Sequence, residues 1–276
     1  MRKTEFSLEV FPPKISDGIE HIYGCLEGLS LVNPDFISVT YSAGTAKKGL
    51  TAEVCGYINA KYGIKSVAHL TCTGATKQSV HDELESLKNH NVKTILALRG
   101  DITEDKPIRD FHYASDLIDE INETGKFDVF GACYPEGHQE SKNFAQDIDV
   151  LKMKADKGVK QFISQLFLDN ADFLHMVNCA LRANITAEFS AGIMPVTSVM
   201  TVDRMIKLSG AKVTAEMNSL LVKYGESKED MRKAGLNYAI KQIRNLIEEG
   251  VSGIHLYTMD NAINTAYIYE GIKDLL

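Results

Sequence analysis

The strongest constraint on the fold is an alternation of short β-rich runs with amphipathic helical patterns along the whole chain. The runs predicted as strands are Thr4–Phe11, Asp35–Tyr41, Lys65–Thr71, Lys93–Leu98, Phe127–Tyr134, Lys160–Phe167, Ala187–Ile193 and Gly253–Thr258. Eight strands, each followed by helical sequence, leave two candidates: a closed (β/α)8 barrel and an open doubly wound sheet.

The segments between the runs carry the helical signals. Apolar residues recur at helical spacing, as in Ile19, Ile22, Leu26 and Leu29. A second stripe is formed by Leu236, Ile240, Ile243 and Ile247. Glycines stand where helices should stop, shortly before a strand, at Gly63, Gly158 and Gly250.

The missing dinucleotide fingerprint favours the barrel over the open sheet. An open sheet that binds a dinucleotide normally carries G-x-G-x-x-G after a strand, and no such motif occurs here. A length of 276 residues is ordinary for one α/β barrel. Because no linker or break in composition interrupts the chain, we expect residues 1–276 to form a single α/β domain with the TIM-barrel fold.

Charge and cysteine usage narrow the class of protein. The net charge is −7 with acidic and basic residues interspersed, so the chain predicts neither a nucleic-acid nor a membrane partner. No apolar run is long enough to span a bilayer, and the N-terminus lacks the apolar stretch of a signal peptide. Five scattered cysteines without a C-x-x-C predict reduced thiols and a cytoplasmic location.

Polar residues gather at the ends of the predicted strands. Alternation along the first strand places Glu9 on the face opposite Phe6, Leu8 and Val10, so Glu9 should point into the barrel near its mouth. Further polar strand ends occur at Thr40-Tyr41, His69, Arg99-Gly100-Asp101, Tyr134 to His138, and Gln165. Barrel enzymes keep their chemistry at this end, and the convergence therefore predicts an active site there.

Nine segments in order resemble one family of flavin enzymes. Glu9-Val10-Phe11-Pro12-Pro13-Lys14 resembles the "E-F-F-P-P-[KR]" opening of methylenetetrahydrofolate reductases. The further segments are Ser38–Tyr41, Ala68–Cys72, Ala97–Asp101, Tyr113–Leu117, Tyr134–His138, Gln165–Asp169, Gly192–Val196 and His255–Thr258. Their order and register are kept over nearly the whole chain, which makes the resemblance specific.

The resemblance implies a reaction in one-carbon metabolism that serves methionine biosynthesis. Reduced nicotinamide, NADH or NADPH, gives a hydride to FAD, which passes it to 5,10-methylenetetrahydrofolate to make 5-methyltetrahydrofolate. The chain is similar to the short microbial form, which consists of the catalytic barrel. The resemblance also implies a homo-oligomer and, in some relatives, a redox partner subunit.

Catalytic roles carry over by position in the matching motifs. Glu9 is expected to be the general acid that protonates the departing N10 of the folate ring, and burial near the barrel axis suits a protonated carboxyl group. Asp101 is expected beside the flavin, where its negative charge disfavours an anionic reduced flavin and stabilises the cationic iminium of the folate. Gln165 is expected to orient the substrate, and Tyr257 to contact it.

The FAD site is implied by a larger set of matching positions. The expected cofactor-binding residues are Thr40, Tyr41, His69, Arg99, Gly100, Asp101, Tyr113, Ala114, Ala132, Tyr134, His138, Asp147 and Lys154. Arg99 and Lys154 are suited to neutralise the diphosphate, and Tyr134 offers a flat surface for a ring. Asp147 and Lys154 also lie seven residues apart on one helical face, where a solvated charged stripe is the structural alternative.

The sequence departs from the family pattern in two places. The last strand of the family continues "Y-T-L-N-R", whereas this chain has Tyr257-Thr258-Met259-Asp260-Asn261, so an asparagine replaces the arginine expected at the glutamate tail of the folate. The segment Glu216–Tyr224 also fails to match. Both departures concern recognition of the tail rather than the redox chemistry.

Two other functions remain as alternatives. A metal-dependent barrel hydrolase would use His69, His138, Asp101 and Glu9, but no His-x-His closes the first strand, and no metal site is expected. A non-catalytic barrel subunit of a folate complex would be expected to lose Glu9 or Asp101, and both are present.

Overall fold

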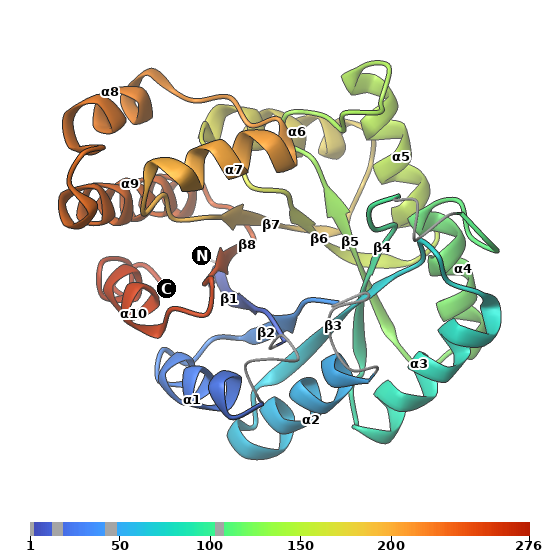
Figure 1. Cartoon of the computed structure of the whole chain (residues 1–276). Helices are drawn as coiled ribbons and strands as arrows, with labels where there is room; N and C mark the ends of the chain where they lie inside the picture. Colours follow the sequence, from blue (N-terminus) through green and yellow to red (C-terminus); the bar gives the residue numbers. More distant parts are fainter. Residues whose placement is uncertain (1–2, 13–18, 42–48, 103–107) are drawn as a thin grey trace. The chain divides into compact units, whose positions relative to one another are not determined.

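The structure is a computed structural model of the whole chain, and residues 3–12, 19–41, 49–102 and 108–276 are described. Pro13 and Lys14 of the opening motif lie outside these ranges. Figure 1 labels the elements along the chain.

The eight strands pair in chain order into one closed parallel barrel, which confirms the predicted (β/α)8 fold. The strands are β1 (Glu5–Val10), β2 (Phe36–Val39), β3 (Lys65–Thr71), β4 (Thr94–Leu98), β5 (Asp128–Cys133), β6 (Val159–Ser164), β7 (Glu188–Ile193) and β8 (Gly253–Tyr257). Every predicted run overlaps one of these strands.

Helices follow each strand of the barrel. They are α1 (Ile19–Ser30), α2 (Leu50–Tyr62), α3 (Lys77–Asn89), α4 (Ala114–Thr124), α5 (Phe144–Asp156), α6 (Asn170–Arg182), α7 (Val199–Ser209), α8 (Ala215–Tyr224), α9 (Lys228–Glu248) and α10 (Ala262–Glu270). The helix stops predicted at Gly63, Gly158 and Gly250 are confirmed, since all three glycines have positive φ values at or just beyond a helix end. The connection after β7 contains three helices, α7 to α9, which the simple alternation did not predict.

The chain divides into two compact units, and each is described by itself. Unit 2 comprises Ser7–Ala132 and Met153–Phe162, and unit 1 comprises Met1–Phe6, Cys133–Lys152 and Ile163–Leu276. The expectation of a single domain over residues 1–276 stays a prediction.

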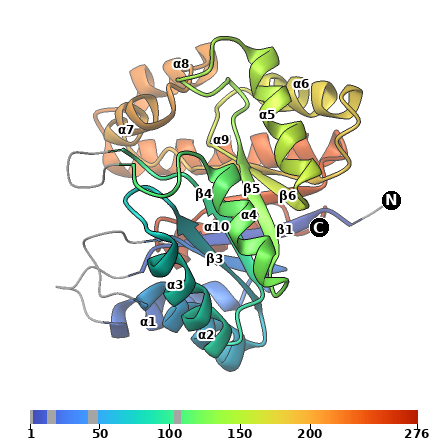
Figure 2. The ribbon, with the colours of Figure 1, turned by 90° about the vertical axis from the view of Figure 1, so that its right-hand side faces the viewer.

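Unit 2 contains the ladder from β1 to β5. Parallel pairing aligns Glu9 with Ser38 of β2, and Ser38 with Val67 of β3. Alternate residues such as Leu8 and Val10 are fully buried against the helices. Helix α3 begins with a capping box formed by Thr76 and Ser79, and it lies beside α2 (Figure 2).

Unit 1 contains β7, β8 and the helices that follow them. Its core is rich in methionine, with Met194 at the end of β7 packed among Met205, Met217 and Met231 of α7, α8 and α9. Unbranched methionine side chains fill irregular spaces, which suits a connection built from three short packed helices.

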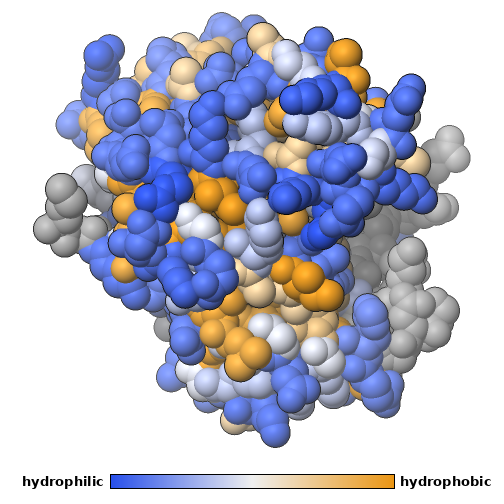
Figure 3. Space-filling view, turned by 90° about the vertical axis from the view of Figure 1, so that its left-hand side faces the viewer, coloured by the Kyte–Doolittle hydropathy of each residue, from blue (hydrophilic) through white to orange (hydrophobic). Residues whose placement is uncertain are grey.

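The face of the molecule in Figure 3 is mainly hydrophilic, and hydrophobic side chains gather in a smaller area of it. Among the helices of the described ranges, none combines the length and apolar character that crossing a bilayer requires.

Candidate active site

Glu9 lies near the carboxyl end of β1 and is only 6% exposed. The hydroxyl of Ser38 donates to Glu9 Oε2 over a long distance of 3.5 Å, and His69 Nε2 of β3 lies 3.3 Å from the same oxygen. Both neighbours are buried. Carboxyl groups are kept at this depth only when polar partners surround them, and this one has a hydroxyl and an imidazole. The carboxyl group therefore lies among β1, β2 and β3 with a hydroxyl and an imidazole beside it.

The turn after β4 is fixed to the turn after β3. The carbonyl oxygen of Arg99 accepts from Cys72 N at 3.1 Å, from Thr73 N at 2.8 Å and from the Thr73 hydroxyl at 2.7 Å. Gly100 has a φ of 84°, and an added Cβ would lie 3.0 Å from Thr71 Cβ. Only glycine suits this position, which sets where Asp101 leaves the strand.

Asp101 and Arg99 differ in exposure at this turn. Asp101 is exposed, while Arg99 is half-buried. An exposed carboxylate and a guanidinium two residues before it are thus presented at the carboxyl end of β4. The exposed carboxylate of Asp101 is available to a ligand bound on that side of the strand.

Thr40 and Tyr41 follow β2. Thr40 continues the ladder by donating its N–H to Val10 O at 3.0 Å, and its carbonyl accepts from the Thr51 hydroxyl at 3.1 Å. Burial, with a smaller contribution from Glu83, raises the pKa of Tyr41 to about 12. Tyr41 is therefore a neutral phenol at physiological pH.

Tyr113 and Ala114 stand at the start of α4. Asp116 accepts from His112 N at 2.8 Å and from Tyr113 N at 3.0 Å, which ends the preceding loop and begins the helix. The Tyr113 side chain is 63% exposed, whereas Ala114 is buried. The exposed ring is available to pack on a ligand.

Lys154 on α5 is a buried cation. Its ammonium group donates to the carbonyl of Ala132, at 3.3 Å, and the residue is only 9% exposed. The alternative of a solvated charged stripe is therefore wrong for this residue. A buried ammonium beside a strand-end carbonyl is suited to an anionic ligand group.

In unit 1, the loop after β5 is organised by Asp147. Its Oδ1 accepts from the Ser141 hydroxyl at 2.7 Å and from His138 N at 3.3 Å. Its Oδ2 is buried without a hydrogen-bond donor among the described residues, and an added Cβ on Gly137 would lie 3.2 Å from it. A buried carboxylate oxygen of this kind is an acceptor that a bound hydroxyl group would satisfy.

The rings of Tyr134 and His138 pack edge to face, with centroids 4.6 Å apart at an interplanar angle of 89°. The Nδ1 atom of His138 accepts from Glu140 N at 3.2 Å. Because Nδ1 accepts this bond, the neutral ring carries its proton on Nε2.

Glu136 in the same loop joins it to the segment between α7 and α8. Its Oε1 accepts from Lys212 N at 2.9 Å. Burial raises the pKa of Glu136, and the hydrogen bond from Lys212 opposes this effect. Sequence reasoning missed this contact because nothing in the local sequence pairs residues so far apart.

Gln165 follows β6, and its backbone N–H donates to Cys133 O at 2.8 Å. Its side-chain Oε1 accepts from Leu166 N at 2.9 Å. That bond fixes which side of the amide faces the backbone, and within the described part of the chain the Nε2 hydrogens are not taken up by an acceptor. The amide can therefore donate to a substrate.

Tyr257, expected to contact substrate, has its hydroxyl committed to the protein. It donates to Ser164 O of β6 at 2.7 Å, and the Ser164 hydroxyl accepts from Gly192 N of β7 at 2.8 Å. A Cβ on Gly192 would lie 2.2 Å from the Ser164 carbonyl oxygen and 2.8 Å from the Tyr257 hydroxyl oxygen. The ring of Tyr257 thus lies over Gly192, and only the partly exposed face of this ring can contact a ligand.

A cavity of about 230 Å³ lies at the carboxyl ends of β7 and β8, a place that sequence reasoning did not single out. It is lined by Met194, Pro195, Thr197, Ser198, Met200, Thr201, Tyr257, Thr258, Met259, Asn261, Asn264, Thr265 and Ile268. Asn261 caps α10, because its Oδ1 accepts from Asn264 N at 2.9 Å. The residue in place of the family's arginine is thus used as a helix cap.

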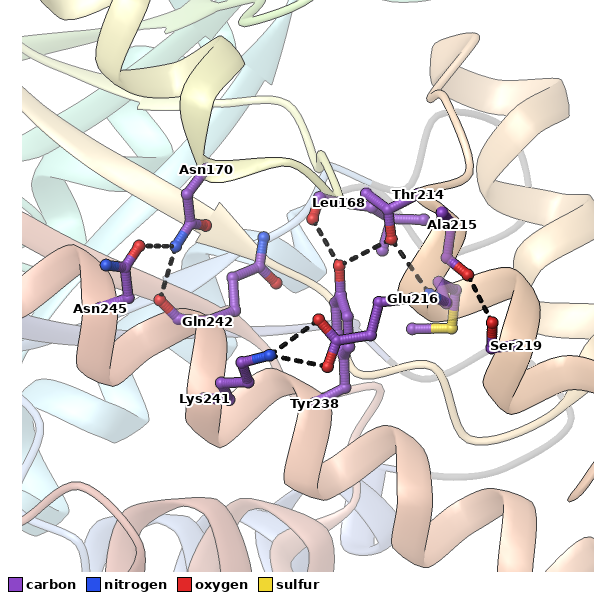
Figure 4. Close-up of polar contacts among 11 residues, drawn as sticks. Leu168, Asn170, Thr214, Ala215, Glu216, Ser219, Tyr238, Lys241, Gln242 and Asn245 are labelled. Carbon is purple, nitrogen blue, oxygen red and sulfur yellow. Dashed lines mark hydrogen bonds and ion pairs between the residues drawn. The ribbon is translucent and has the colours of Figure 1, made fainter. Parts of the chain in front are cut away.

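The segment that fails to match the family forms α8, and Figure 4 shows how its start is held. The Tyr238 hydroxyl donates to Leu168 O at 2.7 Å and lies 3.1 Å from the Thr214 hydroxyl, while Lys241 pairs with Glu216 at 2.8 Å. Lys223 near the end of α8 lies 4.9 Å from the ring centroid of Tyr224. This helix is anchored to α9 and to the loop after β6.

Most of the predicted site residues therefore fall into two local groups. Unit 2 brings Glu9 next to His69, and it places Arg99, Gly100 and Asp101 on a turn tied to the β3 exit. Unit 1 brings Tyr134, His138 and Asp147 together. Sequence reasoning missed Ser38 as a neighbour of the Glu9 carboxyl, although the parallel register between β1 and β2 was the signal that could have found it.

The metal-dependent alternative gains no geometric support. Within the described ranges, no three side chains of histidine, cysteine, aspartate or glutamate come together in a group able to hold a metal ion. His69 is the immediate neighbour of Glu9, and His138 packs on Tyr134 in the other unit.

Comparison with known proteins gives a consistent result. The family model described as methylenetetrahydrofolate reductase matches residues 1–273. The chain is 30% identical to 5,10-methylenetetrahydrofolate reductase of Pectobacterium carotovorum over 93% of its length and 86% of that protein. It is 33% identical to the enzyme of the same name from Buchnera aphidicola, covering 93% of this chain and 87% of the relative.

Two further likenesses concern a longer relative and the fold. Methylenetetrahydrofolate reductase (NADH) 1 of Arabidopsis thaliana is 30% identical over 94% of this chain and 46% of that protein. A solved structure from Clostridium thermocellum, an uncharacterized protein described as binding two copies of 5-methyl-5,6,7,8-tetrahydrofolic acid, has a TM-score of 0.69 at 13% identity. It covers 99% of this chain and 95% of its own, and at this identity the likeness concerns the fold.

Proposed function

Because the chain belongs to the methylenetetrahydrofolate reductase family, an oxidoreductase family, we propose that it binds FAD and uses it to reduce 5,10-methylenetetrahydrofolate with NADH or NADPH. When bound, FAD supplies the two-electron chemistry, accepting a hydride from the nicotinamide and passing it to the folate. The contribution of this chain is to bind both ligands, to place a proton and to set the local charge.

The observation that carries the proposal is the buried Glu9 carboxyl. Opening the five-membered ring of the folate requires a proton at N10, and Glu9 is a buried acid at the carboxyl end of a barrel strand. Ser38 of β2 donates to its Oε2, and His69 Nε2 of β3 lies 3.3 Å from the same oxygen. We assign Glu9 as the proton donor to N10.

Asp101 and Gln165 are assigned to the charged and polar parts of the substrate. Loss of N10 from the methylene bridge leaves a cationic iminium on the folate, and the carboxylate of Asp101 would stabilise this charge. The side-chain Nε2 of Gln165 is oriented by the bond from Leu166 N to Oε1, so it can donate to a folate oxygen or nitrogen.

The residues expected to hold FAD fit its chemistry. Arg99 and the buried Lys154 supply positive charge for a diphosphate, and Tyr113 and Tyr134 supply ring surfaces. The buried Oδ2 of Asp147 lacks a donor in the described structure, and the ribityl and ribose hydroxyls of FAD are donors. This set of cations, rings and an unsatisfied acceptor supports FAD.

The nicotinamide and the assembly are proposed from the same family. The name of the Arabidopsis thaliana relative includes NADH, and either NADH or NADPH is compatible with our proposal. Folate binding is further supported by the description of the Clostridium thermocellum protein as a binder of 5-methyltetrahydrofolate. The homo-oligomer and the redox partner subunit stay predictions.

The experiment that tests the proposal is an anaerobic spectrum of the purified protein. We expect a flavin absorption band that NADH or NADPH bleaches in the absence of folate, and the faster donor identifies the physiological nicotinamide. A colourless protein that also fails to bind added FAD would contradict the proposal.

A further inference from the structure

The cavity at the ends of β7 and β8 has an unusual chemical lining. Of its lining residues, all of which are described, none is acidic or basic. Met194, Met200 and Met259 give it apolar walls, whereas Asn261 and Asn264 at the start of α10 give it amide groups. Its volume of about 230 Å³ suits one arm of a folate rather than the whole molecule.

Both amides have a fixed orientation. Asn261 Oδ1 accepts from Asn264 N at 2.9 Å, and Asn264 Oδ1 accepts from Arg232 Nη1 at 2.9 Å. A guanidinium group can only donate, so the oxygen of Asn264 must face Arg232. The Nδ2 atoms of Asn261 and Asn264 are then left to donate, and neither of them meets an acceptor among the described residues.

Arg232 of α9 is itself held in place. Its Nε and Nη2 donate to the two carboxylate oxygens of Glu229 at 3.3 and 2.7 Å, and its third bond goes to Asn264. The guanidinium therefore stands directly behind an amide that lines the cavity. A donor to the amide oxygen polarises the amide and strengthens the bonds that its N–H groups make.

We propose that Arg232 is a positioning residue for recognition of the substrate's tail. It fixes Asn264 so that the amide groups of Asn261 and Asn264 donate to a carboxylate of the glutamate tail of folate. This inference rests on the proposed function, since the tail belongs to the folate substrate. The charged tail is thus bound by two neutral amide donors, and the guanidinium of Arg232 holds one of them, that of Asn264, in place.

The test compares ligands with and without the tail. Binding of 5-methyltetrahydrofolate and of 5-methyltetrahydropteroate, which lacks the glutamate, is measured by anaerobic titration calorimetry on the FAD-loaded protein. Arg232→Met should raise the Kd for the glutamate-bearing ligand about tenfold, a change of about 1.4 kcal/mol, and leave that of the tail-less ligand unchanged. The KM for methylenetetrahydrofolate should rise in parallel while kcat stays constant, because the tail is remote from the reacting atoms.

Matched variants separate positioning from stability. Arg244 lies on the same helix, its side chain is also 36% exposed, and it also pairs with a carboxylate, that of Asp274 at 2.7 Å. Arg244→Met should therefore leave both affinities unchanged. Arg232→Lys should restore part of the loss, and Asn264→Leu, which keeps the Arg232–Glu229 pair, should reproduce the tail-selective defect of Arg232→Met.

The outcomes distinguish the two proposals. An equal loss for both ligands in Arg232→Met, or the same affinities as Arg244→Met, overturns the role of Arg232 while folate binding stands. A wild-type protein that binds neither ligand and reduces no folate overturns the proposed function, and this inference with it.

Discussion

Replacing Glu9 by glutamine should separate the two half-reactions of the enzyme. Glutamine has nearly the same shape as glutamate but cannot supply a proton to N10 of the folate. Glu9 is only 6% exposed, and its Oε2 lies 3.3 Å from His69 Nε2 and 3.5 Å from the Ser38 hydroxyl. An amide can keep contacts with both neighbours, so the fold should survive the change.

The size of the defect follows from the role. General acid catalysis contributes about 10²–10⁴-fold to a rate, so we expect reduction of methylenetetrahydrofolate to fall by about that factor. Reduction of the flavin by nicotinamide involves no proton from Glu9 and should remain within about threefold of wild type. The free energy of unfolding should change by less than about 2 kcal/mol, because a buried group is replaced by an isostere with hydrogen-bonding capacity.

Anaerobic stopped-flow absorbance measures each half-reaction on its own. Bleaching of the flavin band by NADH or NADPH reports the first half-reaction, and its return on mixing with methylenetetrahydrofolate reports the second. Ser38→Ala serves as a control that removes a neighbour of the carboxyl and keeps the acid. If Glu9→Gln reoxidises with folate within a few-fold of wild type, Glu9 is not the proton donor.

Three other substitutions test separate parts of the structure. Gly100→Ala should destabilise the protein by about 1–3 kcal/mol in urea denaturation and weaken FAD binding, because φ is 84° and Thr71 Cβ lies 3.0 Å from the added atom; unchanged stability would contradict this. Asn261→Arg should lower the KM for folate about 5- to 30-fold with kcat nearly constant, and should cost about 1 kcal/mol of stability through the lost cap of α10; an unchanged KM means that the tail is held elsewhere. Burial alone would raise the pKa of Glu120, but hydrogen bonds from His81 and Lys77 of α3 lower it. The carboxylate of Glu120 therefore stabilises the fold above the pKa of the unfolded state, and this stabilisation is lost as the pH falls through the lower pKa of the folded state. Glu120→Gln should make the free energy of unfolding depend less on pH between about pH 7 and about pH 3. An equal dependence on pH in wild type and variant would refute this.

The strands were predictable because their signal is local. Each β-rich run is short and bounded by helical sequence, and every run overlaps one strand. Alternation in β1 also predicted that Glu9 shares a face with Ser7 rather than with Leu8, and both polar residues are buried. The number of helices after β7 could not be predicted from the alternation, because a long stretch of helical sequence does not show where one helix ends and the next begins.

Contacts between distant residues set the limit of prediction for the site. The bond from the Tyr257 hydroxyl to Ser164 O joins residues 93 positions apart, and no local sequence pattern predicts it. The buried Oδ2 of Asp147 likewise depends on how the loop after β5 folds over Gly137. The cap at Asn261 was not predicted, although asparagine before a helical segment is a common N-cap and was the signal that could have found it.

The proposed reaction is tested most directly by a single-turnover reoxidation. Protein loaded with FAD is reduced anaerobically with one equivalent of NADH or NADPH and then mixed with one equivalent of 5,10-methylenetetrahydrofolate. We predict that the flavin band returns and that about one equivalent of 5-methyltetrahydrofolate is formed, as identified by mass. Reduced flavin that persists after mixing, or a flavin band that returns without 5-methyltetrahydrofolate, would contradict the proposed reaction.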